Sequence, residues 1–242
     1  MTLKAGIISQ ARMNSTRLPG KIFIEVRGKP MLKYHVDRLI KSNIPIYLAT
    51  TSNPDDEKIC EFARKEGLPF YRGSEENVLS RYYECAKSNK LDIIIRVTSD
   101  CPLIDGTIIS HALESYRNMR DLDAYLSNVQ ERTYPRGFDF EIFSFRLLED
   151  AYYHASAPSD LEHVTPFINK NKSGKVNLKH FKNQKDSKDL RVTLDTPEDL
   201  SLIKKIIEEY HADTLSFEEI VGIFENHPEL AKINAHIEQK KV

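Results

Sequence analysis

Three cations lie close together in a stretch that follows the first apolar run of the chain. Arg12, Arg17 and Lys21 are separated by small polar residues such as Ser15, and Gly20 stands near the end of the stretch. An arginine fork can take two phosphate oxygens at once, while a lysine acts as a compact point charge. The stretch is suited to holding a polyphosphate, although an exposed polar turn would have a similar composition. The chain has no Walker A or GxGxxG motif, so side-chain cations would carry much of the charge.

Two aspartates follow runs that have the character of strands. Asp100 comes shortly after the apolar run Ile93–Thr98, and Asp195 comes directly after Arg191–Leu194. Carboxylates at strand ends can hold Mg²⁺, which commonly uses one or two carboxylates together with phosphate oxygens and water. Each aspartate could instead cap a turn, and Asp195 could serve only to enter the helix that Thr196–Asp199 opens. Together the two aspartates favour a metal–triphosphate site.

A third group of candidates lies in Tyr134–Glu141. Arg136 precedes Asp139 and Glu141, and the two acids fall on the same face of a predicted strand because they are two residues apart. The paired carboxylates could contact a sugar or a metal, and Arg136 could hold the carboxylate of an acidic ligand. A solvent-facing strand edge explains the two acids equally well.

Hydrophobic periodicity predicts the elements that must position these residues. Short apolar runs alternate with segments of helical spacing, which is typical of a sheet covered by helices on both faces. Helical crossovers favour parallel strands, whose carboxyl ends would gather the candidates at one edge. In the first half, strands are predicted at Leu3–Gln10, Ile46–Thr50, Phe70–Arg72 and Asp92–Thr98, and helices at Pro30–Lys41, Asp55–Glu66, Asn77–Ser88 and Thr107–Arg117.

The pattern is looser after residue 118. We expect an antiparallel edge or a subunit-contacting arm at about 120–170, and a polar loop at Lys182–Lys188. The overall expectation is a single domain over 1–242 with a three-layer α/β fold, in which a small antiparallel arm accompanies a mostly parallel sheet. In this half, strands are predicted at Ala124–Asn128, Phe138–Ser144 and Arg191–Leu194, and helices at Leu147–His154, Leu161–Asn169, from Thr196 onward, Phe217–Glu225 and Ala231–Glu238.

Composition limits the partners of the chain. The 242 residues carry 35 Lys and Arg against 36 Asp and Glu, so the net charge of −1 provides no general field for a nucleic acid. No stretch approaches the roughly 18 apolar residues of a membrane helix, and we expect a cytoplasmic protein without membrane association. Cys60, Cys85 and Cys101 share no CxxC spacing, which argues against a disulfide framework and a zinc site.

Several motifs resemble those of the cytidylyltransferases that activate 3-deoxy-octulosonic acid and sialic-type acids. The match is closest to the branch called spore coat polysaccharide biosynthesis protein F. Ala11–Lys21 resembles the first motif of the family, and Ser99–Leu103 and Leu194–Asp199 resemble its Asp-x-Pro and Asp-Thr-Pro-Glu-Asp motifs. Arg72–Arg81 and Asp160–Pro166 resemble two further stretches of the branch. The motifs occur in the family's order over nearly the whole chain.

The resemblance implies roles for individual residues. Asp100 and Asp195 would bind Mg²⁺, and catalysis would rest on Arg12, Lys21 and Asp100. One departure is Thr98-Ser99, where octulosonate enzymes have Gln-Gly. The nucleotide would be bound by Arg12, Ser15, Arg17, Lys21, Gly73, Ser74, Arg81 and Thr98, and the sugar by Arg136, Asp139, Glu141, Glu162 and His163.

Structural alternatives exist for two of these residues. Arg81 could pair with Glu76 or Glu84 on a helix surface, which stabilises a helix only slightly. His163 could be an ordinary structural residue of its helix. Asp121–Asp123 matches the DxD motif of metal-dependent glycosyltransferases by letter, but it precedes a predicted strand instead of ending one, so we assign it no role.

The expected reaction is transfer of CMP from CTP to a 2-keto sugar acid with release of pyrophosphate, in surface polysaccharide or glycan biosynthesis. The resemblance also implies a Rossmann-like fold of the nucleotide-diphospho-sugar transferase type, Mg²⁺ as cofactor and a homodimer. One alternative is a metal-dependent glycosyltransferase, which would use a nucleotide sugar and release no pyrophosphate. Another is a nucleotide-binding regulator, which would bind CTP without consuming it.

Overall fold

The computed structural model describes residues 3–238, whose main sheet has seven strands. The strands are β1 (Ala5–Gln10), β2 (Glu25–Val26), β3 (Lys29–Pro30), β4 (Ile46–Thr51), β5 (Phe70–Gly73), β6 (Ile93–Thr98), β7 (Ala124–Ser127), β8 (Glu141–Ser144) and β9 (Asn177–His180). The main sheet has the order β5-β4-β1-β6-β8-β7-β9, and β8 alone in it runs against its neighbours. Strands β5, β4, β1 and β6 are parallel, so their carboxyl ends lie at one edge.

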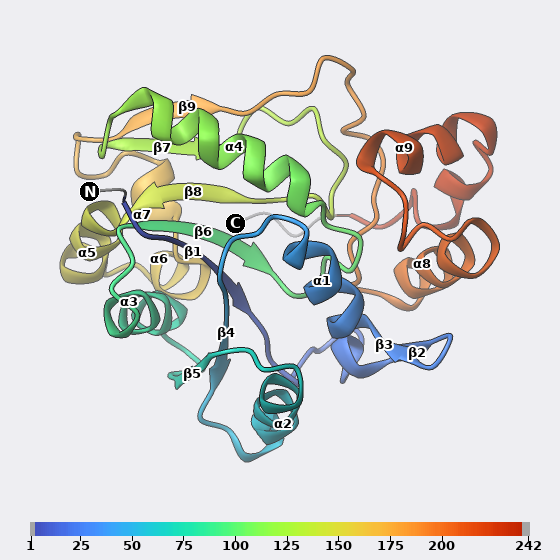
Figure 1. The fold of residues 1–242 in the computed structure, drawn as a ribbon, viewed down its shortest axis with the longest axis horizontal. Helices are drawn as coiled ribbons and strands as arrows, with labels where there is room; N and C mark the ends of the chain where they lie inside the picture. The colour runs from blue at the N-terminus through green and yellow to red at the C-terminus, as the bar shows by residue number, and fades with distance from the viewer. Residues whose placement is uncertain (1–2, 239–242) are drawn as a thin grey trace.

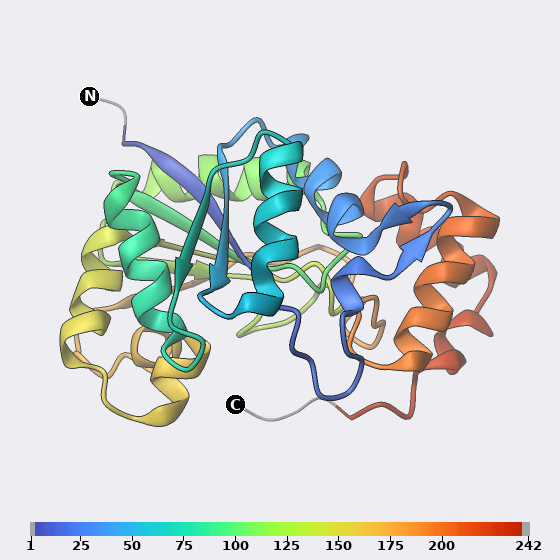
Figure 2. The same cartoon turned by 90° about the horizontal axis from the view of Figure 1, so that it is seen from below.

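Helices cover both faces of this sheet (Figures 1 and 2). They are α1 (Met31–Ile40), α2 (Glu57–Lys65), α3 (Val78–Ser88), α4 (Gly106–Met119), α5 (Phe145–His154), α6 (Pro158–His163), α7 (Pro166–Asn169), α8 (Pro197–Tyr210) and α9 (Phe217–Asn226). Helices α3 and α5 to α7 pack on one face, and α1, α2 and α4 pack on the other. Helices α8 and α9 lie to one side of the sheet, near α1 and the β2–β3 hairpin (Figure 1).

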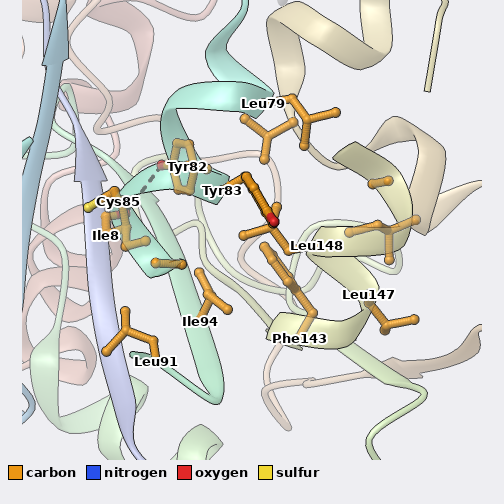
Figure 3. Packing of buried hydrophobic residues seen from close by; sticks show 14 of the residues in the cluster. Ile8, Leu79, Tyr82, Tyr83, Cys85, Leu91, Ile94, Phe143, Leu147 and Leu148 are labelled. Carbon is orange, nitrogen blue, oxygen red and sulfur yellow. Dashed lines mark hydrogen bonds between the residues drawn. The ribbon is translucent and has the colours of Figure 1, made fainter. Parts of the chain in front are cut away.

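The central strands are buried on both faces, as expected for parallel strands between helix layers. Ile8 and Ile94 pack toward α3 and α5, whereas Ile7 and Ile95 pack toward α1 and α4. Figure 3 shows the first cluster, in which the hydroxyl of Tyr82 on α3 donates to the carbonyl of Ile8 at 3.2 Å. Burying each large apolar side chain contributes about 1.5–3 kcal/mol. This packing fixes the strands and therefore the positions from which the site loops start.

The predicted alternation of strands and helices in the first half is confirmed. The predicted helix Asp55–Glu66 starts with a separate 3₁₀ turn, Pro54–Asp56. The β2–β3 hairpin was missed by the sequence patterns. Its turn consists of Arg27 and Gly28, whose φ angles of 52° and 72° are both positive, as a two-residue type I′ turn requires.

The predicted strand Phe138–Ser144 is correct only in its second part, because β8 begins at Glu141. Asn128 gives the physical reason. Its Nδ2 donates to the carbonyl of Phe138 at 2.8 Å, and its Oδ1 accepts from the N–H of Phe140 at 2.9 Å. One side chain therefore supplies the hydrogen bonds that the backbone of a neighbouring strand would have made.

The predicted strand Arg191–Leu194 is wrong. Its first residue forms an isolated β-bridge with Arg136, and its last residue donates its N–H to the carbonyl of Asp100 at 2.8 Å. The segment thus crosses from residue 136 to the turn at Asp100 instead of extending along a strand. This crossing, and not the end of a sheet strand, brings Asp195 to the site.

The predicted helix Leu161–Asn169 is two helices, α6 and α7, which are separated by a tight turn. Val164 has φ 72° and ψ −53°, and the N–H of Thr165 donates to the carbonyl of His163 at 2.8 Å. This is a γ-turn of the strained kind, and a positive φ is uncommon for a β-branched residue. The strain points to a site where the turn itself is needed.

Residues 120–170, where we expected an antiparallel edge or arm, contribute β7 and β8 to the main sheet. Strand β8 is antiparallel to both neighbours but lies inside the sheet, and the separate antiparallel pair is the β2–β3 hairpin. The edge strand β9 was missed because its residues are polar and mostly exposed. The predicted helix Ala231–Glu238 is wrong beyond the 3₁₀ turn Leu230–Ile233.

Three further expectations concern cysteines, the polar loop and membranes. Cys60, Cys85 and Cys101 are buried and form no disulfide. Lys182–Lys188 is a loop without regular structure, as predicted. Among residues 3–238, no helix combines the length and apolar character needed to cross a membrane.

Candidate active site

The cationic loop after β1 is held by contacts at its start and its end. The N–H of Gly20 donates to the carbonyl of Met13 at 3.1 Å, and Gly20 has φ 64°, which favours glycine. The N–H of Met13 donates to the carboxylate of buried Asp56 at 2.7 Å, and Asp56 also accepts from the N–H of Thr51 at the end of β4. The loop is therefore anchored to the edge of the sheet. Its partly or fully exposed side chains include Arg12, Ser15 and Arg17.

Lys21 follows this loop and bridges the two predicted metal aspartates. Its Nζ lies 2.9 Å from Oδ2 of Asp100 and 2.7 Å from Oδ1 of Asp195. Burial lowers the pKa of Lys21, but the two carboxylates outweigh burial and raise it above its ordinary value. Burial likewise raises the pKa of Asp100, but Lys21 outweighs it and holds that pKa well below its usual range. Two acids far apart in sequence thus converge on one ammonium group.

The turn that carries Asp100 rests on a buried chain of neutral groups. Nδ1 of His35 in α1 lies 2.9 Å from the carbonyl of Cys101, so this nitrogen carries the proton. Nε2 then accepts from the hydroxyl of Ser9 at 2.8 Å, and Ser9 Oγ lies 2.8 Å from Oγ of Ser99. Burial lowers the pKa of His35 to about 4, so the ring is neutral at pH 7. The residues on both sides of Asp100 are therefore held in place.

The turn that carries Asp195 is held by charged groups. Nη2 of Arg17 lies 3.2 Å from Oδ2 of Asp195, and Nη2 of Arg191 lies 3.1 Å from the same oxygen. Arg191 also binds Asp199 in the first turn of α8, with 2.8 Å between Nε and Oδ1. Asp195 therefore contacts three cations, of which Lys21 is the one that it shares with Asp100.

These contacts show whether the residues fit Mg²⁺. Among residues 3–238, no group of three or more His, Cys, Asp or Glu side chains is arranged to hold a metal ion. Mg²⁺ that is bound together with substrate phosphates needs only one or two carboxylates from the protein. Asp100 and Asp195 meet this requirement, because each directs a carboxylate oxygen at the same cation.

A second turn at the same edge follows β5. The carbonyl of Ser74, next to Gly73, accepts from Nη1 of Arg81 at 2.9 Å. Arg81 is only 2% exposed, its Nε has no hydrogen-bond partner among residues 3–238, and burial lowers its pKa. The alternative surface pairs with Glu76 and Glu84 are not formed within residues 3–238. The structure therefore brings Gly73, Ser74 and a buried cation together.

A cavity of about 540 Å³ adjoins the carboxyl end of β6. Arg132 in its wall pairs with Asp139, with 2.5 Å between Nη1 and Oδ1 and 3.1 Å between Nη2 and Oδ2. Arg136 makes no ion pair within residues 3–238, so its positive charge is available to an acidic ligand. The predicted site residues that line the cavity are Thr98, Arg136, Asp139, Glu141 and His163.

Glu141 is satisfied by protein groups. It is 5% exposed, and its carboxylate accepts from the hydroxyl of Thr165 at 2.7 Å and also contacts Arg96 and Tyr125. These partners come from β6, β7 and the γ-turn, so Glu141 ties three parts of the cavity wall together. Its contact with a sugar stays a prediction.

Glu162 and His163 lie at the end of α6 and differ in position. The carboxylate of Glu162 lies 4.0 Å from Nε2 of His163 and is mostly exposed, and Glu162 is not part of the cavity wall. His163 lines the cavity, and burial lowers its pKa, so its ring is neutral at pH 7. The strained γ-turn at Val164 therefore places one of the two predicted residues on the cavity.

Comparison with known proteins identifies the family. A family model described as cytidylyltransferase matches residues 5–232. The chain belongs to the cytidylyltransferase family. It is 28% identical over 233 residues to the spore coat polysaccharide biosynthesis protein SpsF of Bacillus subtilis. The match covers 93% of this chain and 95% of that protein.

Solved structures support the same conclusion. A cytidylyltransferase from Leptospira borgpetersenii serovar Hardjo-bovis has a TM-score of 0.89 and 32% identity, covering 99% of this chain and 100% of that chain. A CMP:2-keto-3-deoxy-manno-octonic acid synthetase complexed with CTP has a TM-score of 0.63 and 19% identity. The match covers 86% of this chain and 99% of that chain. At that identity the likeness shows the fold. The expected family, fold and enzyme class are confirmed: this cytidylyltransferase is a nucleotidyltransferase.

The cytidylyltransferase site also contains residues that sequence reasoning missed. His35 sits on the buried side of α1, where a single histidine resembles any other core residue. Arg96 had a usable signal, because it is the one charged residue in the apolar run Ile93–Thr98. Arg191 and Asp199 are each four residues from Asp195, but Arg191 was predicted to lie in a strand and Asp199 to open a helix, so neither was expected to hold Asp195.

Proposed function

We propose that this cytidylyltransferase transfers CMP from CTP to a 2-keto sugar acid of the sialic-acid-like class, in surface polysaccharide or glycan biosynthesis. The observation that carries the proposal is the meeting of Asp100 and Asp195 on Lys21 beside a cavity lined by Arg136, which makes no ion pair within residues 3–238. SpsF, a spore coat polysaccharide biosynthesis protein, supports the biosynthetic role, and the CTP-bound CMP:2-keto-3-deoxy-manno-octonic acid synthetase supports CTP and a 2-keto sugar acid as substrates.

In the proposed reaction, a hydroxyl oxygen of the sugar forms a bond with the α-phosphorus of CTP. The bond from that phosphorus to the bridging oxygen breaks, pyrophosphate leaves with the electron pair, and the hydroxyl loses its proton. Arg12, Arg17 and Lys21 supply positive charge at the loop where the departing pyrophosphate would lie. Preorganised charge of this kind lowers the barrier without requiring covalent chemistry from the protein.

We propose Mg²⁺ as the cofactor, held by Asp100 and Asp195. When bound, Mg²⁺ neutralises phosphate charge and orients the phosphates. Within the protein, the two turns direct a carboxylate oxygen of each aspartate at one point, and Lys21 holds the pKa of Asp100 well below its usual range.

Nucleotide contacts are proposed for the second turn and the end of β6. In the described part of the chain, the Nε of the buried Arg81 guanidinium has no hydrogen-bond partner, and its Nη1 donates to the carbonyl of Ser74, next to Gly73. Thr98 ends β6 and lines the cavity, so it faces the space between nucleotide and sugar. Ser15 in the cationic loop is proposed as a further polar contact of the triphosphate.

The sugar acid is proposed to occupy the cavity. The unpaired guanidinium of Arg136 would hold its carboxylate, because a bidentate arginine suits that geometry. His163, which is neutral at pH 7, is proposed to accept the hydroxyl proton. Asp139 and Glu141 are proposed as hydroxyl contacts, although both already have protein partners, whereas Glu162 lies outside the cavity wall. We further propose that the enzyme acts as a cytoplasmic homodimer.

A direct assay tests this function. Purified protein is incubated with CTP, Mg²⁺ and a panel of 2-keto sugar acids, and pyrophosphate release is measured. We expect release with at least one acid, loss of release with a chelator and loss in Asp100→Asn, while the surface variant Glu209→Gln retains the wild-type rate. Absence of release above the Asp100→Asn background across the panel would overturn the proposal. Turnover of a nucleotide sugar without pyrophosphate would favour the glycosyltransferase alternative.

A further inference from the structure

We propose that Asp199, Arg191 and Asn234 are positioning residues that hold Asp195 in place for metal binding. The inference rests on the proposed function, which assigns Asp195 to the metal. Sequence patterns explain Asp199 only as an acid in the first turn of a helix, and they give Asn234 no role. The contacts of both residues exceed what the start of α8 needs.

Asp199 is fully buried and accepts hydrogen bonds from several directions. Nε of Arg191 lies 2.8 Å from its Oδ1, and Nη2 of the same arginine lies 2.9 Å from its Oδ2. The backbone N–H groups of Asp195 and Thr196 donate to Oδ2 at 3.0 and 3.2 Å. One carboxylate therefore fixes the backbone of Asp195 and the guanidinium that contacts the Asp195 side chain.

Helix α9 provides a natural comparison for this arrangement. Both α8 and α9 begin with a capping box, formed by Thr196 with Asp199 and by Ser216 with Glu219. Glu219 is exposed, and its carboxylate accepts from the N–H of Ser216 at 2.7 Å. A capping box in this protein thus forms at the surface without a buried arginine, so the additional partners of Asp199 serve a purpose beyond starting a helix.

The charges around Asp195 indicate why Asp199 has additional partners. Nη2 of Arg191 lies 3.1 Å from Oδ2 of Asp195, and a cation this close opposes the binding of a second cation. Asp199 offsets the charge of Arg191 by pairing with two of its nitrogens. The cluster then contains three cations, Arg17, Lys21 and Arg191, against three carboxylates. Without Asp199, the region around Asp195 would carry excess positive charge.

Asn234, in the C-terminal part of the chain, contacts both Arg191 and Asp199. It is 2% exposed, and its Nδ2 donates to Oδ1 of Asp199 at 2.8 Å and to the carbonyl of Arg191 at 3.1 Å. One amide group therefore links both members of the ion pair. Groups that orient metal ligands in this indirect way typically change metal affinity or activity by about 10–100-fold when they are replaced.

The experiment measures Mn²⁺ binding in the presence of CTP by electron paramagnetic resonance, alongside thermal unfolding. We expect Asp199→Asn to weaken Mn²⁺ binding by about 10–100-fold. Asn234→Ala should weaken it in the same direction but less, because it removes only neutral donors. Glu219→Gln is the matched control: it disturbs the capping box of α9 and should leave Mn²⁺ binding unchanged.

The outcomes separate this inference from the proposed function. If Asp195→Asn abolishes Mn²⁺ binding but Asp199→Asn and Asn234→Ala bind Mn²⁺ as the wild type does, the positioning role is wrong and the metal site stands. If Asp195→Asn binds Mn²⁺ normally, or if the wild type binds none with CTP, the metal assignment fails and the positioning role fails with it. Should Asp199→Asn not fold, Asn234→Ala decides between the same outcomes.

Discussion

The two aspartates of the site meet on Lys21, yet their turns are held by different kinds of interaction. The Asp100 turn is fixed by the neutral chain of Ser9, His35 and Ser99. The Asp195 turn is fixed by ion pairs with Arg17, Arg191 and, through Arg191, Asp199. Neutral hydrogen bonds hold a carboxylate in place without altering the charge around it. Ion pairs hold it in place and also set how strongly the surroundings attract another cation.

The two kinds of interaction reflect the different positions of the two turns in the fold. The Asp100 turn leaves a central strand that is packed on both faces, so short side chains suffice to hold it. The segment before Asp195 belongs to no strand and lies at the junction of α8 with the residues near 136 and 234. Longer charged side chains bridge that junction. The comparison predicts that the two turns respond differently to mutation and to pH.

The largest effect is expected when the shared cation is removed. Lys21→Met leaves both turns without their common partner and removes a positive charge from the proposed pyrophosphate site. We expect kcat for pyrophosphate release to fall by about 100–1,000-fold, as for the loss of one preorganised charge-stabilising group. The control is Lys205→Met, which removes an exposed lysine paired with Glu209 on α8. An unchanged kcat in Lys21→Met would contradict the central position of this lysine.

Acid should weaken the Asp100 turn as the pH falls below about 6.5, because the buried ring of His35 resists protonation. Burial lowers the pKa of His35 from 6.5 to about 4, so between these values the unfolded chain binds a proton that the folded protein does not. Stability is therefore complete above about pH 6.5 and is lost as the pH falls toward 4, by about 3 kcal/mol for a shift of this size. Asp100, whose pKa is lowered from 3.8, adds its own loss only at lower pH.

Urea unfolding between about pH 7 and pH 4 measures this loss, with His35→Gln as the matched variant. His35→Gln keeps a neutral hydrogen-bonding side chain but cannot titrate, so its stability should depend less on pH over this range. Equal pH dependence in the two proteins would show that His35 is not the group responsible.

The smallest effect is expected from Arg17, and it separates the roles of Arg17 and Arg191 in the Asp195 turn. The side chain of Arg17 is 34% exposed, so its pair with Asp195 is partly screened by water. Arg17→Met should lower the free energy of unfolding by less than about 1 kcal/mol, while it raises KM for CTP because the proposed phosphate contact is lost. Titration with urea and steady-state kinetics check the two parts. A large loss of stability would mean that the charged turn depends on its exposed cation as well as on Arg191.

Local patterns in the sequence were sufficient for the parts of the site that follow regular strands. The runs before Arg12 and Asp100 are mostly apolar, and the structure places both residues at the predicted sheet edge. The α/β fold was also predictable from local patterns, because buried strands and amphipathic helices have different hydrophobic periodicities. Gly73, Ser74 and Arg81 also came together as the resemblance implied.

The remaining features depend on contacts between distant residues, which periodicity does not reveal. Asn128 replaces a strand partner for Phe138 and Phe140, so part of an apparent strand is irregular. The γ-turn at Val164 interrupts an apparently continuous helix and places the hydroxyl of Thr165 against the carboxylate of Glu141, a residue 24 positions earlier in the chain.

The position of Asn234 near the end of the sequence affects the order in which the parts of the site are synthesised. The strands β1, β4, β5 and β6 and the Asp100 turn are all complete before residue 120 has been made. Arg191 and Asp199 are made much later, and the amide that joins them only when residue 234 is added. The strands that carry the cationic loop and Asp100 are therefore synthesised well before the residues that complete the proposed metal site. In this order of assembly, an unfinished chain has no complete catalytic centre.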